Sequence, residues 1–527
     1  MNRNTQSLVE AIHRQFAFLK QAANLETLFV RSISLPSSGG ALVPVAELHR
    51  DDPNMAAQLP VAAWLGDTAR VAFLVLNRQQ RPVGAIGLAS HDSLSLALSI
   101  VFGDVENAVL REAAAVLAKW AEDTLFVEKI IASDGGSAPF WESAGFTGGV
   151  FQASQARLAG ESLILTAGPS ISLREAAYAF DAAKYGWNKE WSKYLTRFEQ
   201  DFATFVGAKH AMACSSGTGA LTIALTALDI GPGDEVIVPD LTWVATANSV
   251  RYVGATPIFA DIELDTWNMD VKSAEALITP RTKAIMPVHM YGHPARMDGI
   301  MALARKHGLY VIEDAAPAIG AEWQGQRCGS FGDFAAFSFQ GAKLLVTGEG
   351  GMLVCNNPQL YEKALKVWDQ GRNPNKTFWI DGHGLKYKMA NIQAALGLGQ
   401  LERCAELVAM KRRIFGWYAE GLHGVRDIHL NSEADGAFSI YWMSSLRLEE
   451  TARVSRDELG AELKKRNVDT RPVFPAISQY PIWGRELTSQ PTALRVGQQA
   501  MNLPSGVCLR REQVDYVCRQ IREVLGA

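Results

Sequence analysis

Apolar and polar positions along the chain follow two different patterns. In residues 68–150 the apolar stretches RVAFLVL, VGAIGLAS and LSLALSIVF follow one another across short polar turns, as antiparallel strands do. A helix over 107–121, a strand at FVEKIIAS and a short helix at APFWESAGF come next. A helix-like stretch over 7–22 and the strand-like LETLFVRSISL precede this series. Strands followed by a helix, a strand and a helix indicate an α+β domain.

Beyond about residue 165, short apolar strands alternate with helices. The strands are AMACSS, DEVIVPD, ATPIFADI, KAIMPVHM and YVIEDAA, and helices such as GALTIALTAL and MDGIMALARKHG lie between them. This alternation predicts a parallel sheet covered by helices on both faces. Ligands of such sheets bind at the carboxyl ends of the strands.

The length of the chain, 527 residues, is too great for one ordinary hydrophobic core. Past residue 400 a long helical region leads into a smaller α/β unit that ends in a helix after Arg511. We therefore expect an N-terminal domain over 1–155, a large α/β domain over 160–400 and a small C-terminal domain over 401–527.

Composition and charge narrow the classes of function. The chain is 48% apolar and 20% charged, with a net charge of −4, so no basic field would attract nucleic acid or a membrane surface. No apolar run approaches the length of a membrane span and no secretory h-region follows Met1, which favours a cytoplasmic protein. The six cysteines are scattered without a CxxC pair, so we expect buried thiols and neither a metal site nor a disulfide framework.

Two candidate features lie in the first half of the α/β region. SSGTGAL follows a strand and opens a helix; its small residues suit a phosphate at the helix N-terminus or, equally, a tight turn with a helix cap. Trp243 ends the next strand and is either a core residue or a stacking platform.

Two further features bring ionisable groups to strand ends. Glu313 and Asp314 close an apolar strand, where a carboxylate serves either as a helix cap or as the partner of a protonated ring nitrogen. Lys343 stands alone among small and apolar residues, so it either reaches solvent along its stem or has a lowered pKa that suits covalent chemistry. Phosphate cradle, ring stack, ring-nitrogen partner and reactive lysine, in this order, are what a pyridoxal-phosphate (PLP) enzyme requires.

From about Leu163 to the C-terminus the chain resembles the DegT/StrS-type family of sugar aminotransferases, which have PLP fold type I. The resemblance rests on GPGDEVIVPDLTWVATAN, PVHMYGHPARMD, IEDAAPAIGA, TGEGG and YKMANIQAALGLGQLE, and DTRPVFPAI is similar to the substrate-side loop of the perosamine-synthase branch. It implies an α/β fold with a large sheet domain and a small C-terminal domain. It also implies PLP as cofactor, glutamate as amino donor and a nucleotide-linked keto-deoxy sugar, of the 4-keto-6-deoxy kind, as acceptor. Amino-sugar synthesis of this type supplies lipopolysaccharide O-antigen.

The resemblance assigns roles to individual residues. Lys343 would bind PLP covalently and shuttle the proton, Asp314 would pair with the ring nitrogen, and Trp243 would stack on the ring. The phosphate would be held by Gly217, Thr218 and Ser338, and by Lys386 of a neighbouring subunit, which implies a homodimer with a shared active site. The chain departs from the family pattern at Pro317, where glutamine is usual, and at Lys386 and Lys388, where Asn and Arg are commoner.

Three residues are candidate substrate ligands. His289 and Tyr291 lie at a strand end, where a structural role is as plausible as a role in substrate binding. Arg471 lies in the segment DTRPVFPAI, which is called the late loop below. Lys343 favours amino transfer, because a related dehydratase branch carries histidine at that place. The alternatives are a transaminase for another keto sugar, such as an oxidised octulosonate, and a PLP-binding regulatory protein without turnover.

The N-terminal segment resembles the GNAT acyltransferase fold. AVLREAAAVLAKWAE fits its acyl-CoA helix and APFWESAGF its late helix. Ala108 and Leu110 stand where glycines hold the CoA pyrophosphate, Gly135 where asparagine is usual, and Trp141 where a tyrosine often serves as general acid. The segment therefore either N-acylates the amino sugar with acetyl-CoA or is a binding or oligomerisation module without turnover.

Overall fold

The computed structural model describes residues 33–44, 70–79, 81–90, 95–104, 106–125, 129–133, 136–151, 163–171, 173–483 and 489–527. The expected helix over 7–22 lies outside these residues, as does most of LETLFVRSISL. Contacts divide the chain into two compact units, one of Met1–Ala159 with Ser170–Tyr185 and the other of Gly160–Pro169 with Gly186–Ala527. In the described part of the chain, no helix combines the length and apolar character that a membrane crossing needs.

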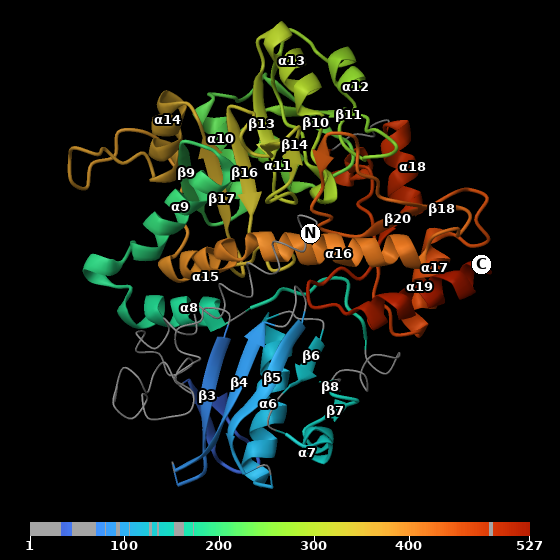
Figure 1. Ribbon diagram of the computed structural model, residues 1–527. Helices are drawn as coiled ribbons and strands as arrows, with labels where there is room; N and C mark the ends of the chain where they lie inside the picture. The colour runs from blue at the N-terminus through green and yellow to red at the C-terminus, as the bar shows by residue number, and fades with distance from the viewer. Residues whose placement is uncertain are drawn as a thin grey trace. The chain divides into compact units, whose positions relative to one another are not determined.

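The first unit contains a mixed sheet with the strand order β1-β2-β3-β4-β5-β6-β8-β7 in its described residues (Figure 1). Strands β1 to β5 pair antiparallel in sequence, whereas β5 and β6 are parallel and are joined through helix α6. The strand–strand–strand–helix–strand–helix order expected for residues 68–150 is therefore observed. The strands are β1 (Ile33–Ser34), β2 (Ala41–Pro44), β3 (Arg70–Leu76), β4 (Pro82–Ser90), β5 (Ser95–Gly103), β6 (Lys129–Ala132), β7 (Phe146–Thr147) and β8 (Val150–Phe151), and the helices are α6 (Ala108–Leu125), α7 (Ala138–Ser143) and α8 (Leu173–Tyr185).

Helix α6 covers the sheet of the first unit with an apolar stripe. Leu110, Ala114, Leu117 and Ala121 recur at helical spacing and are fully buried against strand residues such as Leu98. Helix α8 also groups with this unit, although it lies beyond the expected boundary at residue 155.

The second unit is built on a seven-stranded sheet, within the described residues, with the order β11-β10-β12-β13-β16-β17-β9. All its neighbours are parallel except that β17 runs antiparallel to both β16 and β9. The sheet is therefore mixed, as the parallel or mixed sheet of the expected fold class allows; β17 runs antiparallel because the β16–β17 connection contains no crossover helix. The strands are β9 (His210–Cys214), β10 (Glu235–Pro239), β11 (Thr256–Ala260), β12 (Thr282–Ile285), β13 (Tyr310–Asp314), β16 (Phe334–Ser338) and β17 (Gly351–Cys355).

Helices lie on both faces of this sheet, as Figure 1 shows, and most residues of α10 are buried against it. The helical elements of this part are η2 (Asn188–Glu190), α9 (Lys193–Val206), α10 (Gly217–Ala227), α11 (Ala245–Tyr252), α12 (Val271–Ala276), η3 (Met290–Gly292), α13 (Met297–His307) and α14 (Pro358–Trp368).

The C-terminal part forms a second, smaller α/β layer of the same unit. Its sheet has the order β18-β20-β22-β21, and a small sheet β15-β14-β19 brings residues 437–438 beside the segment that follows β13. Contacts therefore do not separate 160–400 from 401–527 into two units. The elements are β14 (Glu322–Trp323), β15 (Gln326–Arg327), α15 (Asn391–Glu402), α16 (Cys404–Gly421), β18 (Ile428–Leu430), β19 (Ala437–Phe438), β20 (Ser445–Leu448), α17 (Arg456–Lys465), β21 (Arg471–Pro472), η4 (Ile477–Gln479), η5 (Pro481–Trp483), α18 (Pro491–Gln499), β22 (Ala500–Asn502) and α19 (Arg511–Leu525).

The cysteines follow the expectation with one exception. Five of them are buried free thiols, whereas Cys508, in the loop between β22 and α19, is exposed.

Candidate active site

The candidate residues meet at one edge of the seven-stranded sheet. Strands β9, β10, β13 and β16 all run in the same direction, so the segments that follow them emerge at the same edge. These segments carry the predicted features: the SSGTGAL turn after β9, Trp243 after β10, Asp314 at the end of β13, and Ser338 and Lys343 at and after the end of β16.

The first feature is the N-terminus of α10. Ser216 caps the helix, since its hydroxyl accepts the Gly219 N–H at 3.0 Å. A Cβ at Gly217 would lie 3.0 Å from Cβ of Ser338 and 3.2 Å from the Phe337 carbonyl oxygen, so only glycine lets the helix approach β16 this closely. The first N–H groups of a helix lack intrahelical acceptors and bear partial positive charge. Gly217, Thr218 and Ser338 thus form a site suited to a phosphate.

The second feature is the turn from β10 into α11, which places an aromatic ring and a hydroxyl. The Trp243 side chain is 57% exposed, unusual for an indole, and one edge packs on Phe474 with ring centroids 5.6 Å apart. Its carbonyl accepts the Thr246 N–H at 3.3 Å. The Thr246 hydroxyl in turn donates to Oδ2 of Asp314 at 2.6 Å. Trp243 therefore offers exposed ring surface at the same turn whose Thr246 hydroxyl binds the Asp314 carboxylate.

Asp314 is only 5% exposed, and its carboxyl accepts the Thr246 hydroxyl and, at 3.2 Å, the Ala316 N–H. Burial raises the pKa of the Asp314 carboxyl, while the Thr246 hydroxyl and the positive charge of Lys343 act in the opposite direction. A cation bound beside this carboxyl would favour its charged form. Asp314 is therefore a suitable partner for a protonated ring nitrogen.

Lys343 lies in the loop between β16 and β17. Its N–H donates to the Gln340 carbonyl at 2.8 Å, and Gln400 of α15 holds the same loop by accepting the Val346 N–H at 3.2 Å. The residue as a whole is half-buried, and Nζ lies 4.1 Å from the ring centroid of Trp442. Burial lowers the pKa of Lys343 to about 8, against the attraction of Asp314. Near neutral pH this amine is deprotonated far more often than an ordinary lysine, as a nucleophile requires.

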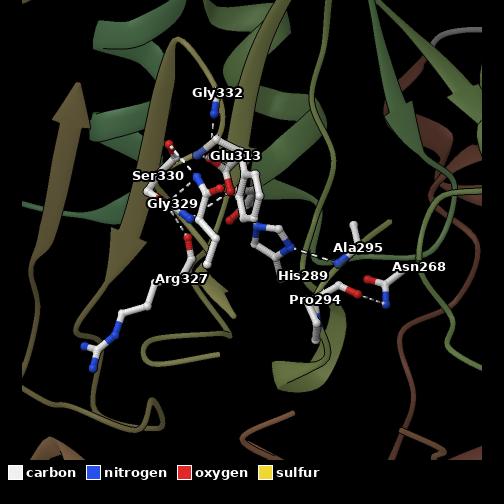
Figure 2. A network of polar contacts seen from close by, with 12 residues as sticks. Asn268, His289, Pro294, Ala295, Glu313, Arg327, Gly329, Ser330 and Gly332 are labelled. Carbon is white, nitrogen blue, oxygen red and sulfur yellow. Dashed lines mark hydrogen bonds and ion pairs between the residues drawn. The ribbon is translucent and has the colours of Figure 1, made fainter. Parts of the chain in front are cut away.

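The neighbouring carboxylate, Glu313, has a structural role (Figure 2). Side chains alternate along a strand, so Glu313 points to the face opposite Asp314. Its Oε1 accepts the N–H groups of Phe331 and Gly332, both at 2.8 Å, and its Oε2 accepts that of Gly329 at 2.7 Å. This carboxylate therefore fixes the turn that leads into β16.

His289 completes the same network. Its Nδ1 accepts the Ala295 N–H at 3.0 Å, and its Nε2 lies 3.0 Å from Oε2 of Glu313, as Figure 2 shows. A backbone N–H can only donate, so Nδ1 carries no proton and the Nε2 proton points to Glu313. The ring is fully buried and both its nitrogens are occupied. The geometry thus gives His289 a structural role and leaves it no free nitrogen for a substrate.

The other two substrate candidates differ in exposure. Tyr291 is buried between Trp442, at 5.8 Å, and Phe474, at 5.6 Å, and its hydroxyl accepts from Nδ2 of Asn502 at 3.2 Å. The ring and the hydroxyl of Tyr291 are therefore both engaged by other side chains of the protein. Arg471 is exposed on β21, directly opposite Asn502 of β22, and presents a free cation at the late loop.

A match to a family model shows to which protein family this chain belongs. Residues 169–522 match the DegT/DnrJ/EryC1/StrS aminotransferase family. The chain is a member of that family. Its resemblance to the family, inferred from motifs, is thereby confirmed, and so is the α/β aminotransferase fold.

Individual relatives are similar to this chain over most of their own length. GDP-perosamine synthase of Caulobacter vibrioides is 42% identical over 365 residues, which are 69% of this chain and 98% of the relative. UDP-N-acetyl-3-dehydro-alpha-D-glucosamine 3-aminotransferase of Acidithiobacillus ferrooxidans is 40% identical over 330 residues, 62% of this chain and 87% of the relative. The PLP-form of Spr1654 from Streptococcus pneumoniae superposes with a TM-score of 0.66 at 27% identity, over 69% of this chain and 99% of that chain. The aminotransferase therefore has PLP fold type I and uses PLP.

The aminotransferase places its two unusual lysines differently. Nζ of Lys388 pairs with Asp369 at 2.7 Å and lies 4.3 Å from the ring centroid of Trp368, so it is engaged within its own chain. Lys386 is exposed, and the same loop carries the exposed side chains Phe378 and Trp379. Of the two lysines, Lys386 is the one open to another molecule.

Sequence reasoning missed two residues of the aminotransferase site. Thr246, which orients Asp314, lies one helical turn after Trp243 in the same motif, so a hydroxyl at that spacing was a usable signal. Trp442, which contacts Lys343, gave no local signal, because it comes from the C-terminal part of the chain.

Proposed function

We propose that this chain transfers an amino group from glutamate to a nucleotide-linked keto sugar of the 4-keto-6-deoxy kind. The observation that carries the proposal is the meeting of Lys343, Asp314, Trp243 and the α10 N-terminus at one sheet edge. The alternative of a PLP-binding regulatory protein without turnover requires none of the lysine chemistry that this edge provides.

The residues fit PLP group by group. The exposed ring face of Trp243 suits an aromatic ring, the buried carboxyl of Asp314 suits a protonated ring nitrogen, and Gly217 with Ser338 suits a phosphate. When bound, PLP supplies an electron sink for the bonds broken in amino transfer.

The work of the protein lies in binding and proton transfer. Nζ of Lys343, with its lowered pKa, would hold the cofactor, and once an amino substrate displaces it from the cofactor the same amine would carry a proton to and from the substrate carbon. Asp314 would keep the ring nitrogen of the bound cofactor protonated, and Thr246 keeps that carboxyl oriented through its 2.6 Å hydrogen bond.

The choice of substrate rests on the relatives and on the late loop. The relative that is 42% identical is named for a GDP-linked sugar, whereas the 40% relative is named for a UDP-linked one and a 3-amino product. Arg471 in DTRPVFPAI presents an exposed cation, which we assign to the diphosphate of the nucleotide. A GDP-linked 4-keto-6-deoxy sugar is therefore the first substrate to test. The runner-up is another keto sugar, such as an oxidised octulosonate.

Product mass tests this function directly. The full chain is incubated with PLP, glutamate and GDP-, dTDP- or UDP-linked 4-keto-6-deoxy sugars, with Lys343→Ala as the matched inactive control. A new amino sugar that the control does not form is the expected result. PLP bound to the wild-type chain without an amine from any of these sugars would overturn the substrate class.

We further propose a homodimer whose sites are shared. Support comes from Lys386, an exposed cation in a loop with exposed Phe378 and Trp379, and from the family, in which a neighbouring subunit completes the phosphate site. Mixing inactive Lys343→Ala chains with impaired Lys386→Ala chains should restore activity, since some hybrid dimers then carry one intact site. Unchanged low activity in mixtures that exchange subunits would contradict the shared site.

For the first unit, the order β3-β4-β5-α6-β6-α7 supports a GNAT-like fold, but its residues do not fit acetyl-CoA. At the start of α6, Asn107 already accepts the Val109 N–H at 2.9 Å and Asp104 the Glu106 N–H at 3.0 Å. A pyrophosphate would meet the carboxylates of Asp104 and Glu106 and find these two donors taken.

The residue at the position expected to hold a general acid also argues against acyl transfer by the first unit. Trp141 is buried between Phe140, at 5.0 Å, and Phe146, at 5.1 Å, where it supplies no acidic hydroxyl. Gly135 lies outside the described residues. We therefore derive no acyl-transfer step and propose a binding or oligomerisation module. Adding acetyl-CoA to the product-mass assay checks this, because an acetylated amino sugar would contradict it.

A further inference from the structure

We propose that Trp442 is a positioning residue for Lys343, and that Lys411 of α16 holds Trp442 in place. This inference deepens the proposed transaminase function and rests on it. It concerns where the lysine amine lies whenever it is not bonded to the cofactor.

The contact between the two side chains is direct. Nζ of Lys343 lies 4.1 Å from the centroid of the Trp442 ring, within the range of a cation–π interaction. The indole N–H of Trp442 donates to the carbonyl of Ala342 at 2.8 Å. Because Ala342 immediately precedes Lys343, this bond ties the ring to the very loop that carries the amine.

A second aromatic side chain also contacts the Trp442 ring. Trp442 stacks on Tyr291, with centroids 5.8 Å apart and an interplanar angle of 27°. A Cβ at Gly292, where φ is +94°, would lie 2.8 Å from the Trp442 backbone nitrogen, so glycine allows the close approach of η3. The ring is therefore held in one orientation.

Lys411 anchors the backbone of the tryptophan. It is 5% exposed, and its Nζ donates to the carbonyl of Trp442 at 2.7 Å and to that of Ser505 at 2.5 Å. No carboxylate lies within ion-pairing distance of Lys411 in the described chain, and burial lowers its pKa to about 7. A neutral amine has two N–H groups, enough for both carbonyls. A buried lysine without a counterion is costly, so the bonds to these carbonyls explain its presence.

These contacts give the free amine a defined resting place. An amine held on the Trp442 face stays beside the edge where the cofactor binds and avoids a search among solvent-exposed rotamers. Misplacement of a reacting group by about 1 Å is enough to slow a reaction about a hundredfold. Trp442 should therefore influence the rate of the lysine steps and leave glutamate affinity nearly unchanged.

The first test compares Trp442→Leu with Trp442→Phe. Leucine keeps the apolar burial but removes the ring face, whereas phenylalanine keeps a face and loses only the N–H bond. In the glutamate half-reaction, followed by the absorbance of bound PLP, Trp442→Leu should be slower by about tenfold or more with little change in KM, and Trp442→Phe should recover most of the rate.

A second readout needs no cofactor. In the PLP-free chain, the pH dependence of Lys343 acetylation by acetic anhydride, measured by peptide mass spectrometry, reports the pKa of this amine. Removing the ring face should lower that pKa in Trp442→Leu, because the charged form loses its stabilising contact, while Asp314, the charged group that acts on Lys343, and Tyr291, the titratable group stacked on Trp442, are retained.

Helix α16 supplies a matched control for Lys411. Lys411→Met removes the bonds to both carbonyls, whereas Tyr418→Phe removes a similar buried bond, from the Tyr418 hydroxyl to the Pro504 carbonyl at 2.9 Å, without touching Trp442. Both variants should be destabilised, but only Lys411→Met should change the Lys343 rate and pKa. Equal behaviour of the two, or a Trp442→Leu variant with wild-type rate and pKa, would overturn the proposal. Failure of the wild-type chain to bind PLP would instead overturn the proposed function.

Discussion

The N-termini of α10 and α6 both follow a strand and a turn, but they differ in how well they suit an anion. In the second unit, α10 begins with small residues against Ser338, and its cap is a neutral serine. In the first unit, α6 begins behind Asp104 and Asn107, whose side chains already accept backbone N–H groups. Each helix has one N–H taken by its cap residue, but only the α6 end carries carboxylates, those of Asp104 and Glu106, so the α10 end is the one suited to an anion. The difference predicts that all phosphate-dependent chemistry belongs to the second unit.

The largest effect should come from Lys343→Ala. Loss of the nucleophile and proton carrier should reduce amino transfer by at least about a thousandfold, while folding is retained. Steady-state rates with glutamate and the keto sugar measure this. Residual activity within tenfold of the wild type would mean that the chemistry lies elsewhere.

A smaller effect, on PLP binding, is expected when a side chain is added at the N-terminus of α10. Gly217→Val would push against Ser338 and the Phe337 carbonyl, and overpacking of this kind weakens PLP binding about tenfold to a hundredfold. Equilibrium titration with PLP checks this. The matched variant Ala108→Val, at the start of α6, should leave PLP binding unchanged; a similar loss in both variants would break the comparison.

A pH effect on stability follows from the buried Lys411. Its pKa is about 7 in the folded chain and near 10.4 when unfolded, so between these values the unfolded chain binds the extra proton. Stability should therefore rise as pH increases from about 7 to about 10.4, by up to about 1.4 kcal/mol per pH unit from this group, and no longer change through it below 7. Denaturant unfolding of the PLP-free chain measures the slope. Lys411→Met should reduce the slope relative to Tyr418→Phe, and parallel slopes would contradict it.

The smallest expected effect concerns the N-terminus of α6 in the first unit. Wild-type chain should show no acetyl-CoA binding by calorimetry, and Asp104→Ala should leave the amino-transfer rate within twofold, since Asp104 belongs to the first unit, where it accepts the Glu106 N–H. Tight acetyl-CoA binding by the wild type would show that the α6 end is an anion site after all.

Much of the site was predictable because it depends on short-range patterns. Each of Trp243, Asp314 and Lys343 follows or ends an apolar strand, and the rule that parallel strands end at one edge brings them together. The same rule could not tell that His289 is enclosed, since its occupancy depends on Glu313 and on the Ala295 N–H, and neither bond leaves a local pattern. Nor did alternation of strands and helices reveal that β17 runs antiparallel.

The amino-acid sequence predicts the candidate reactive groups and the sheet edge on which they lie, because residue chemistry and strand periodicity are local properties. Tertiary structure alone decided the surroundings of those groups. It placed Trp442, from the C-terminal part, against the Lys343 loop and Lys411 against the Trp442 carbonyl, and it packed Trp442 and Phe474 on the Tyr291 ring. Such contacts join residues far apart in the chain, and the packing of whole elements selects them, so no local pattern encodes them.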